Sequence, residues 1–132
     1  MADPLQISVV TPEETVVETT ADSVVVPLFD GEIGILPKHA PMIGRLGYGE
    51  MRLTTGGETT SYYVDGGFVQ VSENTVSVLT GKASASADLN ADAAKTQLEE
   101  GLKRVASGED EIAIRDRLLS QARAQLRLVS KI

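Results

Sequence analysis

Hydrophobic and polar residues alternate in short runs from residue 5 to residue 79, which is the pattern of half-buried β-strands. In the first run, Leu5, Ile7 and Val9 fall on one face of a strand over residues 5–10. Further strands are predicted over 15–20, 23–29, 33–35, 50–54, 59–64, 68–72 and 75–79. Short strands at such close intervals predict an all-β sandwich or barrel.

Turn-forming residues separate these runs. The last four predicted strands are connected at Gly56-Gly57, at Asp65-Gly66-Gly67 and at Glu73-Asn74. These residue types tolerate positive φ or cap a turn with their side chains, so each of the three sites is predicted to reverse the chain.

From about residue 83 the composition shifts to Ala, Ser, Leu, Gln and charged residues without proline, which favours helix. The first predicted helix has Asn90 or Asp88 as its N-cap and an apolar stripe of Ala94, Leu98, Leu102 and Val105. Ser107-Gly108 ends it. The second has the apolar stripe Leu119, Ala122, Leu126 and Val129. Two short helices with a short connection predict an antiparallel hairpin.

The chain therefore divides into a predicted β-sandwich over residues 1–86 and a helical hairpin over 87–132. Charge is divided in a similar way, because residues 1–88 carry twelve acidic and four basic residues while residues 89–132 carry seven and eight. The whole chain of 132 residues has a net charge of −7, which argues against general binding of nucleic acid, since phosphate binding needs clustered Lys and Arg. The two parts are predicted to have different roles.

Several classes of chemistry find no support in the composition. Without cysteine the chain forms no disulfide, thiolate nucleophile or thiolate metal site. The first residues lack the basic and apolar segments of a secretory signal or transit peptide. No apolar run approaches the roughly 18 residues of a membrane-spanning helix, so membrane association is expected only through partners.

Motifs of catalysis are also missing from the sequence. There is no phosphate-binding loop, no nucleophile elbow and no dinucleotide-binding glycine motif. His39 is the only histidine, and no spacing of ligands supports a metal site. A Ser/His/Asp triad around His39 is left open by the sequence, but we expect no catalytic residues, cofactor or metal.

Residues 30–41, DGEIGILPKHAP, hold two glycines and two prolines, so their backbone path is tightly defined. They form either a plain turn at the ends of a strand or a recognition loop that displays Glu32 and His39. This segment resembles the signature G-x-[FLI]-G-[IV]-L-P-x-H-A-P of the epsilon subunits of F-type ATP synthases. Residues 7–13, 46–53 and 66–79 resemble further motifs of that family in the same order.

The resemblance implies a β-sandwich of about ten strands followed by an antiparallel α-helical hairpin. It also implies a rotor subunit of the central stalk, which couples proton-driven rotation of the c ring to ATP synthesis in the catalytic head. The implied partners are the gamma subunit and the c-ring subunits, through the sandwich, and the alpha/beta catalytic head, through the C-terminal helices. The subunit performs no bond chemistry and holds no cofactor, and the implied location is the cytoplasmic side of the bacterial plasma membrane, rather than a plastid thylakoid.

Site residues follow from the same resemblance. Glu32 matches the family position that approaches the polar loops of the c ring, and His39 lies in the turn beside it, after Lys38, where the family commonly has Gly or Asn. These three residues are the expected contacts with the c ring and gamma. The alternative for Glu32 is a solvated surface carboxylate.

The helical hairpin of bacterial relatives can release from the sandwich and obstruct ATP hydrolysis by contacting acidic loops of the beta subunits. The resemblance implies Arg115, Arg123 and Arg127 as the residues that contact the beta subunits. The alternative is a solvated helix face. Some relatives also bind ATP through an [IL]-D-x-x-R-A motif, where this chain has Asn90 and Ala93, so we expect weak or absent ATP binding and interpret Asn90 as a helix cap.

Two other functions are kept as alternatives. One is a freestanding acidic β-sandwich that binds a sugar or peptide, with the helices as a dimerisation tail. The other is a small hydrolase that uses His39. The first requires a ligand pocket, usually lined by aromatic side chains, and aromatic residues make up only 4% of this chain.

Overall fold

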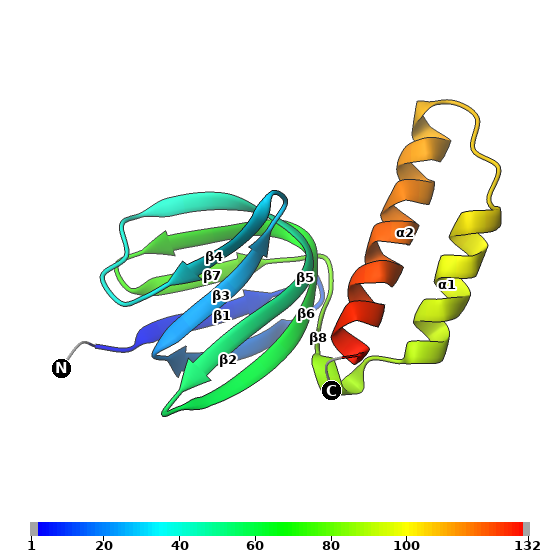
Figure 1. Ribbon diagram of the computed structural model, residues 1–132. Helices are drawn as coiled ribbons and strands as arrows, with labels where there is room; N and C mark the ends of the chain where they lie inside the picture. The colour runs from blue at the N-terminus through cyan, green and yellow to red at the C-terminus, as the bar shows by residue number, and fades with distance from the viewer. Residues whose placement is uncertain (1–2, 131–132) are drawn as a thin grey trace. The chain divides into compact units, whose positions relative to one another are not determined.

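The computed structural model describes residues 3–130, which form strands followed by helices (Figure 1). The elements are β1 (Leu5–Val10), β2 (Thr15–Ala21), β3 (Ser23–Leu28), β4 (Gly31–Ile35), β5 (Met42–Thr55), β6 (Glu58–Ser72), β7 (Thr75–Leu79), β8 (Ala83–Ala85), the 3-10 helix η1 (Ser86–Asp88), α1 (Ala91–Lys103) and α2 (Glu109–Val129). They fall into two compact units, Met1–Ala85 and Ser86–Ile132.

The first unit is a β-sheet of eight strands in the order β2-β1-β7-β6-β5-β3-β4, with β8 paired to β6. Neighbouring strands are antiparallel except β1 and β7, which are parallel. The sheet curls over itself (Figure 1). Between β2 and β3, the Asp22 N–H donates a hydrogen bond to the carbonyl of Thr54, near the C-terminal end of β5, at 2.8 Å. The predicted all-β sandwich is confirmed. It has eight strands because β5 and β6, with 14 and 15 residues, are each long enough to replace two shorter strands.

Aliphatic side chains at alternate strand positions fill the interior of this unit. Strand β1 buries Leu5, Ile7 and Val9, as its alternation predicts, and β1 and β7 have the predicted bounds. Each such side chain contributes about 1.5–3 kcal/mol when it leaves water. The core therefore consists mainly of Val, Leu and Ile, although the aromatic side chain of Tyr63 is also fully buried.

Strand β5 changes the face that it buries partway along its length. Leu46 is buried before the change, and Met51 and Leu53 are buried after it, so the buried positions pass from even to odd residue numbers. The change falls within residues 47–49, where the register between β3 and β5 also shifts. Extra residues in one strand of a pair form a β-bulge, which turns the following side chains to the other face.

Strand β6 makes the same change opposite β5. Val64 is buried before the change, and Val69 and Val71 are buried after it. Gly66 and Gly67 lie between them with φ of 69° and 105°, a region that residues with a Cβ rarely enter.

The turn predicted at Asp65-Gly66-Gly67 is therefore wrong. These residues lie inside β6, and pairing with β5 continues through them, since Asp65 pairs with Tyr48 and Gly67 pairs with Leu46. A Cβ at Gly67 would overlap the carbonyl oxygen of Leu79 in β7. The glycines serve a change of face and a close approach between strands, not a chain reversal.

The second unit holds η1 and the two helices, described by themselves. Helix α1 begins after Asn90, whose Oδ1 accepts a hydrogen bond from the Ala93 N–H at 3.0 Å, which confirms the predicted cap. Between the helices, the Gln97 side-chain amide donates to the Leu118 carbonyl at 2.9 Å and to the Gln121 side chain at 3.1 Å.

The apolar stripe predicted for α1 is wrong in its second half. Leu102 is exposed, and Val105 is exposed and lies beyond the end of the helix at Lys103. Gly101 is buried instead, and a Cβ there would lie 2.8 Å from the Leu119 side chain of α2. The Leu119 side chain therefore packs closely against α1 at Gly101, so the glycine that lowers helix propensity permits close packing. In the part of the chain that the structure describes, no helix is long and apolar enough to cross a membrane.

We predict that Gly67→Ala lowers the free energy of unfolding of the sandwich by about 3 kcal/mol, because the new Cβ overlaps backbone and the φ is unfavourable. The three tyrosines lie in β5 and β6, so tyrosine fluorescence during urea unfolding follows this unit. Gly34→Ala is the matched control, since a Cβ there meets nothing within 4 Å, and it should stay within about 0.5 kcal/mol of the parent. Equal stability of the two variants would contradict the prediction.

Candidate functional site

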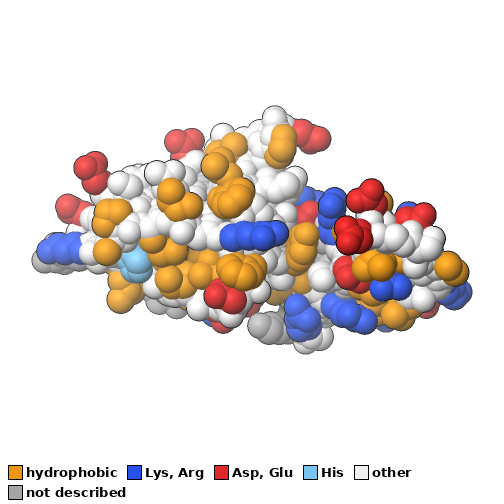
Figure 2. All heavy atoms as spheres, turned by 90° about the horizontal axis from the view of Figure 1, so that it is seen from above, with side chains coloured by type: hydrophobic (Ala, Val, Ile, Leu, Met, Phe, Trp, Pro, Cys, Tyr) orange, Lys and Arg blue, Asp and Glu red, His pale blue; other side chains and the backbone are white. Residues whose placement is uncertain are grey.

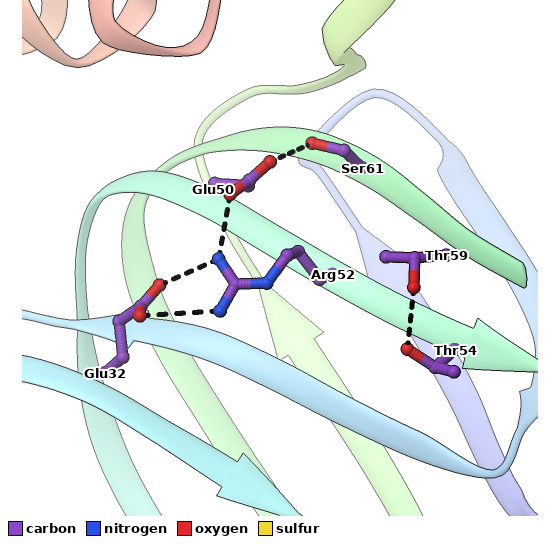
Figure 3. Close-up of polar contacts among 6 residues, drawn as sticks. All are labelled: Glu32, Glu50, Arg52, Thr54, Thr59 and Ser61. Carbon is purple, nitrogen blue, oxygen red and sulfur yellow. Dashed lines mark hydrogen bonds and ion pairs between the residues drawn. The ribbon is translucent and has the colours of Figure 1, made fainter. Parts of the chain in front are cut away.

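A chain of charged and polar side chains runs across β4, β5 and β6 on the outer surface of the sheet (Figure 3). We name Glu32, Glu50, Arg52 and Ser61 the Arg52 cluster. Arg52 Nη1 and Nη2 donate to the two carboxylate oxygens of Glu32 at 3.2 and 3.4 Å. Nη1 also donates to Glu50 at 2.8 Å, and the Ser61 hydroxyl donates to the other Glu50 oxygen at 2.6 Å. Arg52 therefore links two carboxylates from different strands.

The two carboxylates of the cluster differ in exposure. The Glu32 side chain is 52% exposed and the Glu50 side chain 13%, with Arg52 between them at 31%. Hydrogen bonds to Glu50 and then to Glu32 raise the pKa of Arg52. The guanidinium thus keeps its charge throughout the neutral range, and any stability that it adds is lost only at strongly alkaline pH. Two carboxylates and one guanidinium leave a net charge of −1.

Lys38 and His39 lie in the loop between β4 and β5. Lys38 has a φ of 68°, and its N–H donates to the Asn74 side chain at 2.6 Å. The His39 N–H donates to the Leu36 carbonyl at 3.1 Å, and its Nδ1 lies 2.7 Å from the Ala40 carbonyl. This carbonyl accepts a hydrogen bond from Nδ1, so the ring is engaged within its own turn.

The structure does not bring the three predicted contact residues together. Glu32 follows Gly31 at the start of β4, whereas Lys38 and His39 come after the end of β4. Glu32 belongs to the Arg52 cluster, and the loop that holds Lys38 and His39 is attached to the turn between β6 and β7. The segment of residues 30–41 therefore presents two separate surfaces.

A second surface is apolar and exposed. We name Phe29, Ile43, Phe68 and Leu79 the apolar face; their exposed fractions are 68%, 74%, 56% and 51%. In Figure 2, hydrophobic side chains gather around the pale-blue side chain of His39, the single histidine. Contiguous exposed apolar side chains on a folded protein mark an interaction site more often than chance.

Strand register makes these side chains neighbours. Phe68 in β6 is paired with Leu79 in β7 and with Arg45 in β5, and the Arg45 guanidinium lies 6.0 Å from the centre of the Phe29 ring. Ile43 lies two residues from Arg45 on the same face of β5. The apolar face is thus a row across adjacent strands, with one cation among aromatic side chains.

Two shallow hollows border the apolar face. One, of about 380 Å³, is lined by Pro41, Met42, Ile43, Gln70, Val71 and Ser72. The other, of about 330 Å³, is lined by Val10, Thr11, Pro12, Leu79, Thr80 and Gly81. Both hollows are open at the surface. They therefore suit side chains of a protein partner better than a small molecule, which usually binds in an enclosed pocket.

Sequence reasoning missed the apolar face, although a signal was present. In β6, Phe68 shares the face of Gln70, opposite the buried Val69 and Val71. In β7, Leu79 shares the face of Ser77. Phe68 and Leu79 are large apolar residues at strand positions that face solvent. Their presence there indicates a surface that a partner covers.

The basic residues of α2 do not form one cluster. Arg123 and Arg127 are exposed and four residues apart, hence on one face of the helix. Arg115 lies two turns earlier, is half-buried and forms an ion pair with Asp116 at 3.6 Å. Asn90 Oδ1 is engaged in capping α1, and no group of His, Asp and Glu suited to a metal is found within residues 3–130.

Comparison with known proteins agrees with these features. Residues 4–86 match the family model of the ATP synthase delta/epsilon chain, beta-sandwich domain. The chain is 47% identical over 119 residues to the ATP synthase epsilon chain of Rhodopirellula baltica, covering 90% of this chain and 93% of that one.

Two solved structures are similar in fold. A chain of the Euglena gracilis mitochondrial ATP synthase, solved with OSCP, F1 and c ring, has a TM-score of 0.74 at 20% identity and covers 96% of this chain and 78% of its own. A chain of the central stalk and c ring of the Tetrahymena thermophila mitochondrial ATP synthase has a TM-score of 0.76 at 15% identity, with 97% and 98% covered.

We predict that Lys38→Gly raises the free energy of unfolding by about 0.5–1 kcal/mol, because glycine adopts a φ of 68° without the steric penalty that lysine carries. Urea unfolding followed by tyrosine fluorescence measures the change. Lys38→Ala removes the same charge without relieving the backbone, so it should not stabilise the fold. A gain shared by both variants would show that charge, not backbone conformation, is responsible.

Proposed function

We propose that this chain, which belongs to the epsilon-chain family of ATP synthases, works as the central-stalk subunit that joins gamma to the c ring. A match of the family model over residues 4–86 and an identity of 47% over most of the chain show the membership, which confirms the identification from sequence motifs. As an epsilon chain it is a subunit of ATP synthase and not itself catalytic. It is therefore part of a membrane-associated complex.

The apolar face carries the proposal for gamma. Its four side chains are more than half exposed, although burying each one would be favourable by about 1 kcal/mol or more. Ile43, Phe68 and Leu79 lie on strands whose opposite faces form the core, so this part of the surface is rigid and preformed, and Phe29 lies in the turn between β3 and β4. A stiff apolar row with one cation suits a permanent protein neighbour, and gamma is the stalk subunit that we assign to it.

The Arg52 cluster supports a separate contact with the c ring. Glu32 is exposed, charged and held on the outer surface of the sheet, which suits polar loops better than an apolar partner. Lys38 and His39 lie in the neighbouring loop and are proposed to contact gamma or the c ring from there. Each such rim contact is expected to be modest, about 0.2–1 kcal/mol.

The hairpin is proposed to inhibit ATP hydrolysis. Arg123 and Arg127 are exposed on one face of α2, available to acidic loops of the beta subunits in the catalytic head. Arg115 is half-buried and paired with Asp116, so it is the weakest of the three candidates while the helices are packed together. The subunit is proposed to lie on the cytoplasmic side of the bacterial plasma membrane, as part of the complex. This location is supported by relatives from bacteria.

The family membership leaves no need for the two alternative functions. A freestanding sugar- or peptide-binding module requires an enclosed pocket, and the two hollows beside the apolar face are open. A hydrolase would use His39 as a base, whereas an epsilon chain is a subunit of ATP synthase and not itself catalytic.

We predict that Ile43→Ser combined with Phe68→Ser weakens binding to purified gamma by about 30-fold, the factor that corresponds to roughly 2 kcal/mol of lost apolar burial. Isothermal titration calorimetry with the full chain measures the affinity. Leu102→Ser combined with Val105→Ser removes two exposed apolar side chains from the hairpin and should leave gamma binding unchanged. Equal losses in the two pairs would contradict the proposed face.

We predict that Arg123→Gln combined with Arg127→Gln weakens inhibition of ATP hydrolysis about two- to thirtyfold, because each of the two exposed ion pairs contributes about 0.2–1 kcal/mol. The measurement is hydrolysis by the catalytic head stripped of this subunit and titrated with the full chain. Lys95→Gln combined with Lys103→Gln removes the same charge from α1 and should not change inhibition. Unchanged inhibition by the α2 variant, with binding intact, would leave Arg123 and Arg127 as a solvated helix face.

A further inference from the structure

We infer that Arg52 is a positioning residue for the contact with the c ring: it holds the Glu32 carboxylate in the orientation in which a hydrogen-bond donor of the c-ring loop meets it. The inference rests on the proposed function, because it takes Glu32 as the residue that faces the c ring. It adds that Glu32 does not act alone and that its partner on this chain lies twenty residues away in another strand.

The backbone at Glu32 is held by fewer hydrogen bonds than a central strand position. Strand β4 is the last strand of the sheet, so one of its edges has no neighbouring strand in the sheet order. On its other edge Glu32 is paired with Pro27 of β3. The preceding residue, Gly31, has a φ of 144°, so the strand begins there with a flexible residue type.

Arg52 supplies the missing constraint through side chains. Its guanidinium reaches from β5 across β3 to β4, and its two terminal nitrogens meet the two Glu32 oxygens at 3.2 and 3.4 Å. A two-pronged contact fixes the plane of the carboxylate as well as its position, which a single bond from lysine does not. Figure 3 shows Arg52 lying between Glu32 and Glu50.

The guanidinium is itself anchored. Glu50, with only 13% of its side chain exposed, accepts from Arg52 Nη1 at 2.8 Å, which is shorter than either contact to Glu32. Glu50 is in turn held by the Ser61 hydroxyl at 2.6 Å. The firm end of the cluster is thus on the central strands β5 and β6, and the exposed end is Glu32.

The charges of the cluster indicate which partner group fits. Arg52 balances one of the two carboxylates, and the remaining negative charge is nearest the solvent on Glu32. The Glu32 carboxylate still accepts hydrogen bonds while it is paired with Arg52. The matching group on the c-ring loop is therefore a hydrogen-bond donor, either a cation or an amide.

A double-mutant cycle tests the inference. Catalytic heads that carry gamma and the full chain are titrated onto lipid vesicles that hold only the c ring, and the half-saturating concentration is measured by sedimentation. We expect Arg52→Gln and Glu32→Ala each to raise it about two- to fivefold, the range of an exposed ion pair. In the Glu32→Ala background, Arg52→Gln should have no further effect. Arg52→Lys keeps the charge without the two-pronged contact and should fall between the parent and Arg52→Gln.

Each other outcome overturns the inference. If the effects of Arg52→Gln and Glu32→Ala multiply, Arg52 acts independently of Glu32; if Arg52→Gln has no effect while Glu32→Ala has one, Glu32 needs no positioning. If Glu32→Ala itself has no effect, the proposed c-ring contact fails, and binding to gamma, measured separately, shows whether the rest of the proposed function stands. Lys82→Gln is the charge-matched control, and if Arg52→Gln unfolds, Arg52→Lys takes its place in the cycle.

Discussion

The pairing of β5 with β6 is the constraint on which the sandwich depends. Both strands must change the face that they bury, at residues 47–49 and 65–67, while they stay paired along their whole length. Gly67 meets this demand because its φ of 105° and its closeness to Leu79 admit no side chain. Each of the two long strands therefore buries one face at one end and the opposite face at the other end.

The same change of face separates the two candidate surfaces. Before it, the outward positions of β5 hold Ile43 and Arg45, which belong to or border the apolar face. After it, the outward positions hold Glu50 and Arg52, which form the less exposed end of the Arg52 cluster. One strand pair therefore presents an apolar surface and a polar surface at fixed places, and a rotor subunit needs two such rigid contacts.

The strands with strict alternation could be predicted from sequence, since β1 and β7 have the expected bounds and the cap at Asn90 is confirmed. The roles of the glycines could not be predicted from sequence, because they depend on tertiary contacts. Gly66-Gly67 has the composition of a turn, and only the neighbouring β7 backbone shows why it lies within a strand. Gly101 likewise lowers helix propensity, and its use appears only when α2 packs against it.

The arrangement of the candidate site could be predicted only in part, for a similar reason. Motif resemblance indicated Glu32, Lys38 and His39 as candidate contacts, but spacing along the chain did not reveal that β4 separates Glu32 from the other two. Arg52 lies within residues 46–53, which were recognised only as a motif of the family, because its contact with Glu32 depends on strand order rather than on sequence distance. In the sequence, Phe68 and Leu79 interrupt the alternation of apolar and polar residues. Assigning the strands does not by itself show that these two side chains form an exposed surface.

Cross-linking in the assembled enzyme tests whether one sandwich holds gamma and the c ring on two different surfaces. The chain has no cysteine, so Phe68→Cys and Glu32→Cys each introduce a single thiol into this subunit. We predict that a short thiol-reactive cross-linker joins position 68 to gamma and position 32 to a c subunit. Cross-links from both positions to the same subunit, or from neither position to the stalk, would contradict it.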